Sequence, residues 1–323
     1  MAEIRQQDFE TSRPQDIETS RLQDFKTSRL QDFEPGSKTR SLVVFISDAH
    51  LGSGADSLER ERELCAFLDS IKDDCRQLFL LGDIFDFWFT YRHLVPRGYT
   101  RLLGKLAELS DLGVEIHFFI GNHDMWLFDY LEQECGAIMH SDPEVLEIDG
   151  RRFLIGHGDG QGHLDKNYST LRRIFRSRLN QRLFALLPPA WTFPIARRWS
   201  DSNKVKHARQ DTLRYLGDDR EGIVIYCKER LMHEPLDYCV FGHRHTPLVR
   251  ELKVESIERK EESATHYPLS TTHLPLSTLY VNTGDWLLNR NYAVYSLNDH
   301  TLRLYDLCSS GSHEIQKGEI AGC

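Results

Sequence analysis

The chain has 323 residues, with 40 lysines and arginines against 49 aspartates and glutamates, and a formal net charge of −9. Its hydrophobic share of 40 % and charged share of 28 % are ordinary for a globular protein, and they argue against a membrane span, a collagen-like chain or a wholly disordered one. The acidic balance argues against a general nucleic-acid binder, so no nucleic acid is expected as a partner.

The first predicted segment is a tail at residues 1–40. Residues 5–35 repeat with a period of eight, as in RPQDIETS and RLQDFKTS, and carry too few apolar side chains to bury a core, so we expect disorder here. No apolar stretch typical of a signal peptide follows Met1, and the seven cysteines are scattered without a CxxC pair. These features predict a cytoplasmic protein with reduced thiols.

Residues 41–308 follow as the predicted main domain, in which apolar strands alternate with helical periodicity. The predicted strands are Leu42–Ile46, Leu78–Leu81, Val114–Ile120, Phe153–Ile155, Tyr238–Phe241, Leu279–Asn282, Tyr292–Ser296 and Leu302–Tyr305. The predicted helices are Leu58–Ile71, Tyr99–Leu112 and Ile223–His233. This alternation predicts an α/β sandwich with functional side chains at the carboxyl ends of its strands.

Five of the predicted strands end in a glycine or serine that is followed by side chains able to bind metal ions. The first strand runs into Asp48 and His50, and the second runs into Asp83. Later strands run into Asn122-His123-Asp124, His157-Gly158-Asp159 and His243-Arg244-His245. Because strand ends on one edge of a sheet converge, we expect these groups to meet in one pocket.

Two carboxylates, one amide oxygen and four imidazoles, without thiolate, are typical ligands of a divalent ion such as Mn²⁺, Fe²⁺, Zn²⁺ or Mg²⁺. Seven side chains exceed what one ion needs, and a carboxylate that bridges two ions about 3.5–4 Å apart accounts for the excess. A lone histidine at a strand end is more often structural. Five such motifs in order, each after a buried strand, favour a two-metal site instead.

The segment after the fourth motif is basic, in contrast to the rest of the chain. Between His163 and Tyr215 stand twelve lysines or arginines against three aspartates, a net charge of +9 that leaves −18 elsewhere. From Leu171 to Leu187 apolar residues recur at three- and four-residue spacing, with basic residues on the other faces. We predict a helical cap at residues 163–216, apolar within and basic outside, that meets an anionic partner. A solvated helix face and ordinary helix packing are the alternatives.

Two further segments are predicted to lack regular structure. A charged stretch rich in prolines and hydroxyls predicts a loop insertion at residues 253–278. Residues 309–323 are expected to form a disordered tail.

The ordered motifs D-x-H, G-D, G-N-H-D, G-H-G-D and G-H-x-H resemble those of the calcineurin-like metallophosphoesterases, over residues 42–306. The resemblance implies two mixed sheets flanked by helices, with a helical cap inserted. It also implies two ligand sets that share Asp83. The first is Asp48, His50, Asp83 and His245, and the second is Asp83, Asn122, His157 and His243. His123 is implied as the catalytic residue, which stabilises the transition state or acts as a general acid.

Within that superfamily the chain is similar to the UDP-2,3-diacylglucosamine diphosphatases of lipid A biosynthesis. In that branch an aspartate follows eight residues after the histidine of the H-G-D motif, then a tyrosine, and here Asp165 and Tyr168 hold those places. His123 and Asp86 depart from the best-known members, which have arginine and glutamate there. The substrate-binding residues implied are Asp165, Tyr168, Arg172, Arg198, Ser202 and Lys204.

The predicted function is therefore hydrolysis of the diphosphate of UDP-2,3-diacylglucosamine, to UMP and 2,3-diacylglucosamine 1-phosphate, with two divalent ions and Mn²⁺ as the expected metal. The expected partners are this UDP-linked acylated glucosamine lipid and an anionic membrane surface, on the cytoplasmic side of the cell membrane. Two alternatives stay open: a generic soluble phosphodiesterase, phosphatase or nuclease, and a non-catalytic metal-binding scaffold. The sequence indicates no oligomeric state.

Overall fold

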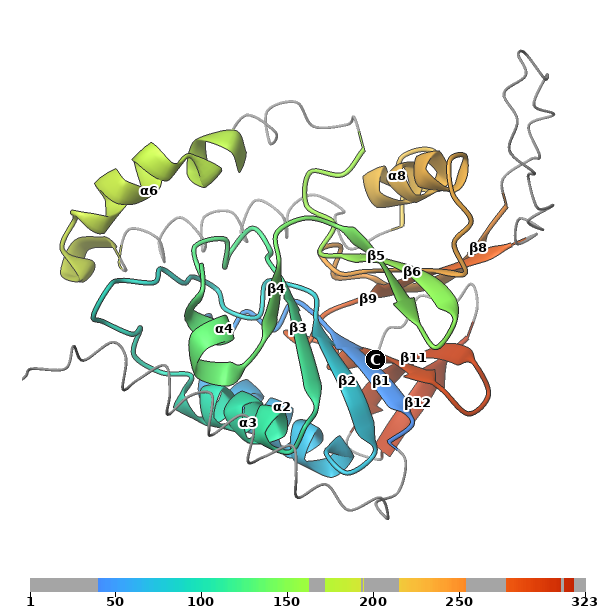
Figure 1. Cartoon of the computed structure of the whole chain (residues 1–323), viewed down its shortest axis with the longest axis horizontal. Helices are drawn as coiled ribbons and strands as arrows, with labels where there is room; N and C mark the ends of the chain where they lie inside the picture. Colours follow the sequence, from blue (N-terminus) through green and yellow to red (C-terminus); the bar gives the residue numbers. More distant parts are fainter. Residues whose placement is uncertain are drawn as a thin grey trace, which may run out of the picture. The chain divides into compact units, whose positions relative to one another are not determined.

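Two β-sheets face each other in the computed structural model (Figure 1). The structure describes residues 40–162, 172–192, 194, 215–253, 277–308 and 311–316. Of the predicted segments, the tail at 1–39, residues 163–171, 193 and 195–214 of the cap, and residues 254–276 of the loop insertion lie outside the described residues.

The larger sheet has seven strands in the order β12-β11-β10-β1-β2-β3-β4. Their bounds are β1 (Leu42–Ile46), β2 (Cys75–Leu80), β3 (Glu115–Phe119), β4 (Ile138–His140), β10 (Asn291–Ser296), β11 (Thr301–Cys308) and β12 (Gly311–Ile315). The first four run parallel, and β10, β11 and β12 continue the sheet antiparallel from β1. Strands β1 to β3 are buried on both faces, which explains their nearly continuous apolar runs.

The smaller sheet has five strands in the order β5-β6-β7-β9-β8. Their bounds are β5 (Glu144–Ile148), β6 (Arg151–Gly156), β7 (Tyr238–Phe241), β8 (Pro247–Leu252) and β9 (Thr278–Thr283). The three central strands β6, β7 and β9 are parallel, and an antiparallel strand closes each edge. The carboxyl ends of β6 and β7 therefore lie side by side.

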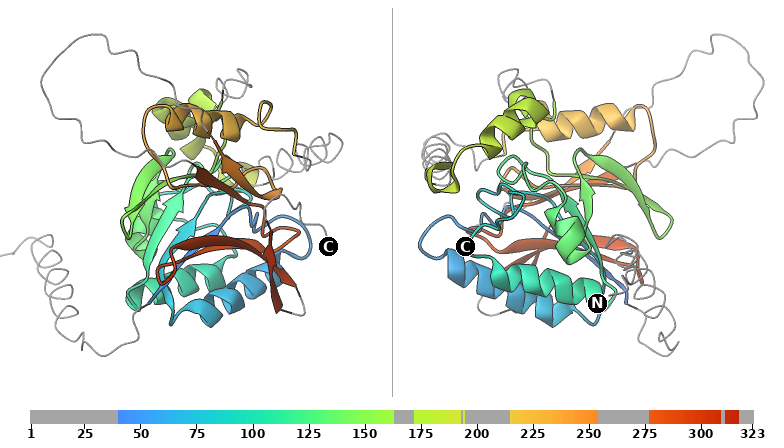
Figure 2. Two further views of the ribbon diagram at one scale, coloured as in Figure 1. Left: turned by 90° about the vertical axis from the view of Figure 1, so that its right-hand side faces the viewer. Right: turned by 60° about the vertical axis from the view of Figure 1, so that its left-hand side comes forward.

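Helices cover the outer face of each sheet (Figures 1 and 2). Helices α2 (Ser57–Ile71), α3 (Thr100–Asp111) and α4 (Tyr130–Cys135) pack on the larger sheet, and α8 (Gly222–Leu231) packs on the smaller one. In α2, Leu64 and Leu68 recur one turn apart and are fully buried. Each such side chain contributes about 2 kcal/mol through burial. Between the sheets a separate core forms around Phe45, Phe79 and Phe153.

The predicted α/β sandwich is confirmed: every strand predicted between residues 41 and 308 is present, as are the three helices predicted outside the cap, with ends that differ by at most three residues. The sequence reading missed α4, β4, β5, β8 and β12. Apart from β8 (PLVREL), these elements are short or polar, as EVLEI in β5 shows, so their periodicity is weak.

The tail expected at residues 309–323 is wrong in part, because β12 lies within it. This strand pairs with β11 and places Ile315 opposite Leu304, where the Ile315 side chain is buried. The open edge of β11 supplies the hydrogen-bond partners that a polar sequence such as GSHEI needs to form a strand.

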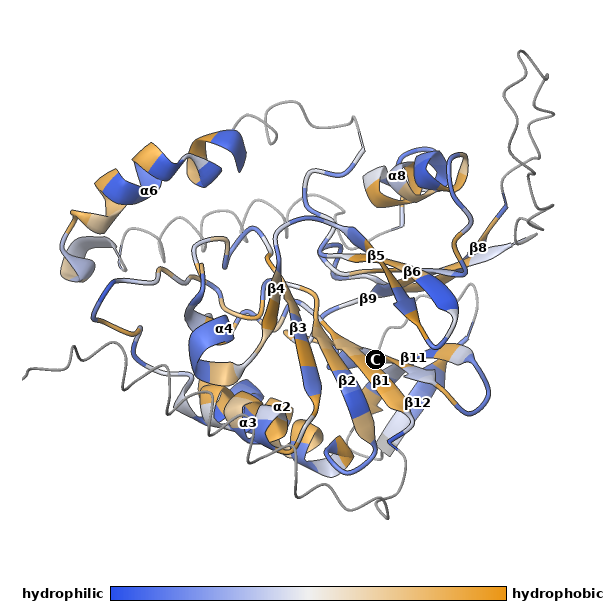
Figure 3. Cartoon of the chain, viewed as in Figure 1, coloured by the Kyte–Doolittle hydropathy of each residue, from blue (hydrophilic) through white to orange (hydrophobic). Residues whose placement is uncertain are grey.

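The described part of the cap is helical at residues 172–176 and again in α6 (Arg178–Ala185). The single helix expected from Leu171 to Leu187 is therefore wrong, because Ser177 is extended, with φ −66° and ψ 119°. Ser177 is the residue before α6, and its side chain makes no capping hydrogen bond. Hydrophilic and hydrophobic residues alternate along α6 (Figure 3). No helix within the described ranges is long and apolar enough to cross a membrane.

Candidate metal centre

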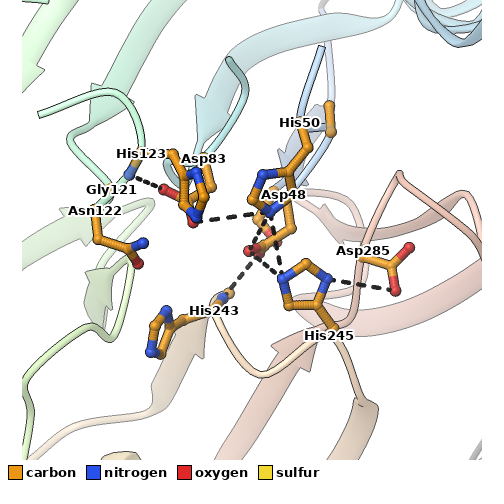
Figure 4. A network of polar contacts seen from close by, with 12 residues as sticks. Asp48, His50, Asp83, Gly121, Asn122, His123, His243, His245 and Asp285 are labelled. Carbon is orange, nitrogen blue, oxygen red and sulfur yellow. Dashed lines mark hydrogen bonds and ion pairs between the residues drawn. The ribbon is translucent and has the colours of Figure 1, made fainter. Parts of the chain in front are cut away.

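The polar side chains predicted at five strand ends come together at one edge of the sandwich (Figure 4). The loops after β1, β2 and β3 bring Asp48, Asp83 and Asn122 from the larger sheet. The loops after β6 and β7 bring His157 and His243 from the smaller sheet. The site thus lies where the carboxyl ends of both sheets meet, as the strand-end pattern predicts.

The first group of potential ligands is Asp48, His50 and His245, whose ligand atoms all lie within 4.8 Å of one another. The His245 Nε2 atom is 3.3 Å from Asp48 Oδ1 and 3.4 Å from His50 Nε2. The Asp83 Oδ2 atom is 3.8 Å from His50 Nε2, so the Asp83 carboxylate reaches this group as well. Two imidazole nitrogens that face each other leave room for one proton, or for a cation that both bind.

The second group is Asp83, His157 and His243, again within 4.8 Å. The His157 Nε2 atom lies 3.4 Å from Asp83 Oδ2, 3.3 Å from Asn122 Oδ1 and 3.2 Å from His243 Nδ1. The same oxygen of Asp83 therefore borders both groups. This is the position required of a carboxylate that bridges two ions.

The chemistry of the donor set fits divalent cations. Asp48 Oδ1 is buried and accepts no hydrogen bond within the described part of the chain. An unsatisfied buried carboxylate oxygen is costly, and a bound cation removes that cost. Burial also raises the pKa of Asp48, so a neighbouring positive charge is needed to keep it ionised.

The electrostatics keep two of the candidate ligand imidazoles neutral, whereas the neighbouring carboxylates, Asp83 first, raise the pKa of a third, His157. Burial lowers the pKa of His50 to about 3 and that of His243 well below its usual range, so both rings are neutral with a lone pair to donate. Burial alone would raise the pKa of Asp83, but the neighbouring His157 and His123 imidazoles hold it well below its usual range. The shared carboxylate is therefore an anion.

Most of the ligand residues stand in an unusual backbone conformation. Five of them adopt a positive φ between 43° and 67°, namely Asp48, His50, Asp83, His243 and His245. This left-handed conformation is uncommon for residues other than glycine. It turns the chain sharply at the strand end, where Asp48 and His50, and likewise His243 and His245, reach the site from positions two residues apart.

Two glycines allow these loops to approach one another. A Cβ atom at Gly121 would lie 2.2 Å from Asp83 Oδ1, and one at Gly242 would lie 2.7 Å from Asp48 Oδ2. Neither position has room for a side chain. The glycines that end β3 and β7 in the sequence thus mark close contacts between the loop backbones and the ligand carboxylates.

His123 lies beside the first group of ligands. Its backbone N–H donates to Asp83 Oδ1 at 2.8 Å, and its ring Nδ1 donates to the Asp86 carbonyl at 2.9 Å. Its ring meets the His50 ring edge to face, with centroids 4.6 Å apart. Because Nδ1 donates, Nε2 is the atom left to face a substrate.

Two buried aspartates flank the site without having been predicted as site residues. The Asp86 carboxylate lies 3.3 Å from His50 Nδ1 and 3.7 Å from His123 Nδ1. Asp285 lies 3.8 Å from His245 Nδ1. These carboxylates orient the rings from behind. In the sequence Asp86 stood out only as a departure from the glutamate of the best-known members, and it was given no role at the site.

Of the six predicted substrate-binding residues, only Arg172 lies within the residues that the structure describes. Asp165, Tyr168, Arg198, Ser202 and Lys204 lie outside the described residues. Arg172 is described, and its guanidinium pairs with Asp159 and Asp142 rather than pointing at the metal ligands.

The cap docks on the body through aromatic side chains near His123. The Phe184 ring of α6 lies 4.5 Å from Trp126 and 4.9 Å from Phe89, between ring centroids. Trp126 Nε1 also donates to the Phe175 carbonyl at 2.9 Å. Such aromatic pairs are worth about 0.5–1.5 kcal/mol each beyond their buried area. The cap is thus attached next to the reactive centre.

The apolar face predicted to point inward is only partly covered. Among residues 172–192 of the cap, six apolar residues are at least 43 % exposed, namely Ile174, Leu179, Leu183, Leu186, Leu187 and Trp191. The helix carries more apolar residues than the contact around Phe184 can bury, which leaves an apolar surface beside the site.

The chain is similar in sequence to proteins of one family. A match to the calcineurin-like phosphoesterase family covers residues 41–247. A UDP-2,3-diacylglucosamine hydrolase from Porphyromonas gingivalis is 38 % identical over 271 residues, which cover 79 % of this chain and 94 % of that protein. A protein of the same name from Ectopseudomonas mendocina is 30 % identical over 217 residues, or 66 % of this chain and 85 % of that one. Among solved structures, the E. coli phosphoesterase Yfce aligns at 15 % identity with a TM-score of 0.33, over 81 % of this chain and 96 % of that one.

Proposed function

The chain belongs to the calcineurin-like phosphoesterase family, and we propose that it hydrolyses the diphosphate of UDP-2,3-diacylglucosamine in lipid A biosynthesis. The products are UMP and 2,3-diacylglucosamine 1-phosphate. The observation that carries the proposal is the pair of ligand groups that share Asp83, set beside a cap with apolar and basic faces. The relatives named UDP-2,3-diacylglucosamine hydrolase support it.

Two divalent ions, which we infer to be Mn²⁺, would be held by the two groups. Asp48, His50, Asp83 and His245 would hold the first, and Asp83, Asn122, His157 and His243 the second. Such a pair supplies an activated water and neutralises phosphoryl oxygens during in-line attack. The protein's own part is to fix the ligands, through the turns at the strand ends and the neutral state of His50 and His243.

His123 is the residue proposed to act on the reacting phosphate. Its Nδ1 donates to the Asp86 carbonyl, which fixes the ring and leaves Nε2 toward the substrate. In the protonated form, Nε2 can donate to the leaving oxygen or stabilise the developing charge. The Asp86 carboxylate lies 3.7 Å from the same Nδ1 atom.

The cap is proposed to bind the acyl chains and to meet an anionic membrane surface at the cytoplasmic side of the cell membrane. The exposed apolar residues of the cap stand beside three exposed arginines, Arg173, Arg178 and Arg182. Leu94 and Val95 add apolar surface on a loop that reaches the cap through a hydrogen bond of 2.6 Å between Tyr91 and Thr192. Each arginine near an anionic leaflet contributes about 1 kcal/mol. Sedimentation with anionic vesicles should fall as salt rises, and Leu183→Ser should weaken it.

The decisive experiment compares two substrates. Purified protein with Mn²⁺ should turn over UDP-2,3-diacylglucosamine far faster than bis(p-nitrophenyl) phosphate, which tests only the metal centre. Equal rates would contradict the lipid assignment and leave a general phosphodiesterase. Added EDTA should abolish both activities, and Mn²⁺ should restore them.

A further inference from the structure

The loop that joins β1 to α2 supplies two candidate ligands of the first ion, Asp48 and His50. Both residues adopt a positive φ, 52° at Asp48 and 43° at His50. Residues other than glycine are strained in this conformation, which persists only where the surrounding structure holds it. The contacts made by the backbone of this loop therefore decide whether the two side chains keep their places in the site.

The N–H groups of this loop are held by the loop that follows β2. The Asp48 N–H donates to the Gly82 carbonyl at 3.1 Å, and the His50 N–H donates to the Asp83 carbonyl at 2.9 Å. These bonds satisfy the backbone donors of the two ligand residues. The carbonyl groups of the same buried stretch need donors from elsewhere.

One buried guanidinium supplies those donors. Arg60 lies in the first turn of α2, and its side chain is 1 % exposed. Its Nε atom donates to the Ala49 carbonyl at 3.3 Å, and its Nη2 atom donates to the carbonyls of His50, at 3.2 Å, and Ser53. Its Nη1 atom pairs with Asp56 Oδ2 at 2.6 Å. A single side chain thus binds three backbone carbonyls of the loop that carries the ligands.

The chemistry of arginine suits this arrangement. Its guanidinium carries five N–H donors in a planar fork, so one side chain can serve several carbonyls at once. A buried ion pair is by itself weak evidence for stabilisation, because an apolar side chain of similar volume often packs as well. The ion pair with Asp56 therefore does not explain why Arg60 is buried. The three loop carbonyls do, because they would lose these donors in its absence.

We propose that Arg60 is a positioning residue for the first ion, because its guanidinium holds the strained loop that presents Asp48 and His50. The proposal rests on the proposed function, since it takes the two groups of candidate ligands as the sites of two divalent ions. The hydrogen bonds and the ion pair of Arg60 all lie within residues 49–56, and the second group draws its ligands from other loops. Loss of Arg60 should therefore weaken the first ion selectively.

The test measures Mn²⁺ binding and loop opening instead of turnover. Arg60→Met keeps a long unbranched side chain and removes every donor. Calorimetric titration of the metal-free wild type with Mn²⁺ should show two sites, and in Arg60→Met one of them should weaken by about 10- to 100-fold while the other is unchanged. At one equivalent of Mn²⁺, electron paramagnetic resonance of the variant should show a single uncoupled ion. In the metal-free protein, hydrogen exchange at the His50 amide should become faster.

Two variants separate this role from general stabilisation. Glu61→Gln is the matched control, because Glu61 is the neighbouring buried charge of α2 and accepts instead from the Arg101 and Leu102 N–H groups at the start of α3. It should lower the melting temperature and leave both Mn²⁺ sites intact. Asp56→Asn removes the charge of the ion pair and leaves the three carbonyl bonds in place, so it should not change Mn²⁺ binding.

Binding of both ions with wild-type affinity in Arg60→Met, or an equal weakening of both, would overturn the proposal. Should Arg60→Met fail to fold, Arg60→Lys keeps the charge without the fork and should show the same loss at one site. If the wild-type protein does not bind two Mn²⁺ ions, the proposed function fails. Hydrogen exchange at the His50 amide then still decides whether Arg60 holds the loop.

Discussion

The close approach at Gly121 gives a prediction in which the substituted residue is itself neither a candidate metal ligand nor a titrating group. In Gly121→Ala the new methyl carbon would lie 2.2 Å from Asp83 Oδ1 and 2.5 Å from the Asp83 backbone nitrogen. Relief of this contact requires a shift of about 1 Å, and misplacement of that size costs about 100-fold in rate. Because Asp83 borders both ligand groups, we expect a loss of about 100-fold in kcat/KM and weaker binding of both ions.

The assay is turnover of bis(p-nitrophenyl) phosphate with Mn²⁺, together with metal analysis and thermal unfolding of the same samples. Gly104→Ala is the matched control, because Gly104 lies in α3 with nothing within 4 Å of its missing Cβ. That variant should keep full activity and gain about 0.5–1 kcal/mol of stability. Retention of both ions and of activity within about twofold in Gly121→Ala would refute the reasoning.

Three further predictions follow from the site and the cap. His123→Ala should lower kcat by about 100-fold or more while both ions stay bound, as turnover and metal analysis would show; loss of the ions would instead make His123 a ligand. Phe184→Ala should raise the KM for UDP-2,3-diacylglucosamine by about tenfold, because it removes the aromatic contacts to Trp126 and Phe89. An unchanged KM would show that this contact of α6 has no part in substrate binding. Burial lowers the pKa of His50 to about 3 in the folded state against 6.5 normally, so the unfolded chain binds the extra proton and the metal-free protein should lose stability as pH falls from 6.5 toward 3. Denaturant unfolding gives the free energy of unfolding at pH 4.5 and 7.5, and the difference between the two values should be smaller in His50→Asn than in the wild type. An equal difference in the two proteins would exclude His50 as the cause.

The convergence of the candidate metal ligands was predictable because each of them depends on local sequence. Asp48, Asp83 and His157 follow apolar strands closely in the sequence. Because strand ends converge in an α/β sandwich, these residues are expected at one site. The assignment of Asp83 to both groups came from a family resemblance, and the distances from its Oδ2 atom to His50 and His157 agree with it.

The contacts behind the ligands were not predictable in this way. Asp86 lies in the loop after β2 and contacts His50 and His123, which lie in two other loops. Asp285 lies in the loop after β9, where it accepts from the Asn289 backbone N–H, and it contacts His245 in the loop after β7. The hydrophobic periodicity of the sequence predicts helices and strands, but not which loops contact one another. The cap shows the same limit: its spacing predicted helix, but neither the break at Ser177 nor the face that stays exposed.

The positive φ angles at five candidate ligand residues imply a conflict between catalytic activity and thermal stability. Each such residue costs on the order of 1–3 kcal/mol relative to relaxed backbone, and glycine at the same place would not incur it. A lineage that no longer needed the reaction would gain stability by accepting glycine at these positions. Selection for catalysis therefore keeps the domain less stable than its three apolar cores permit, and inactive descendants should outlast active ones on heating.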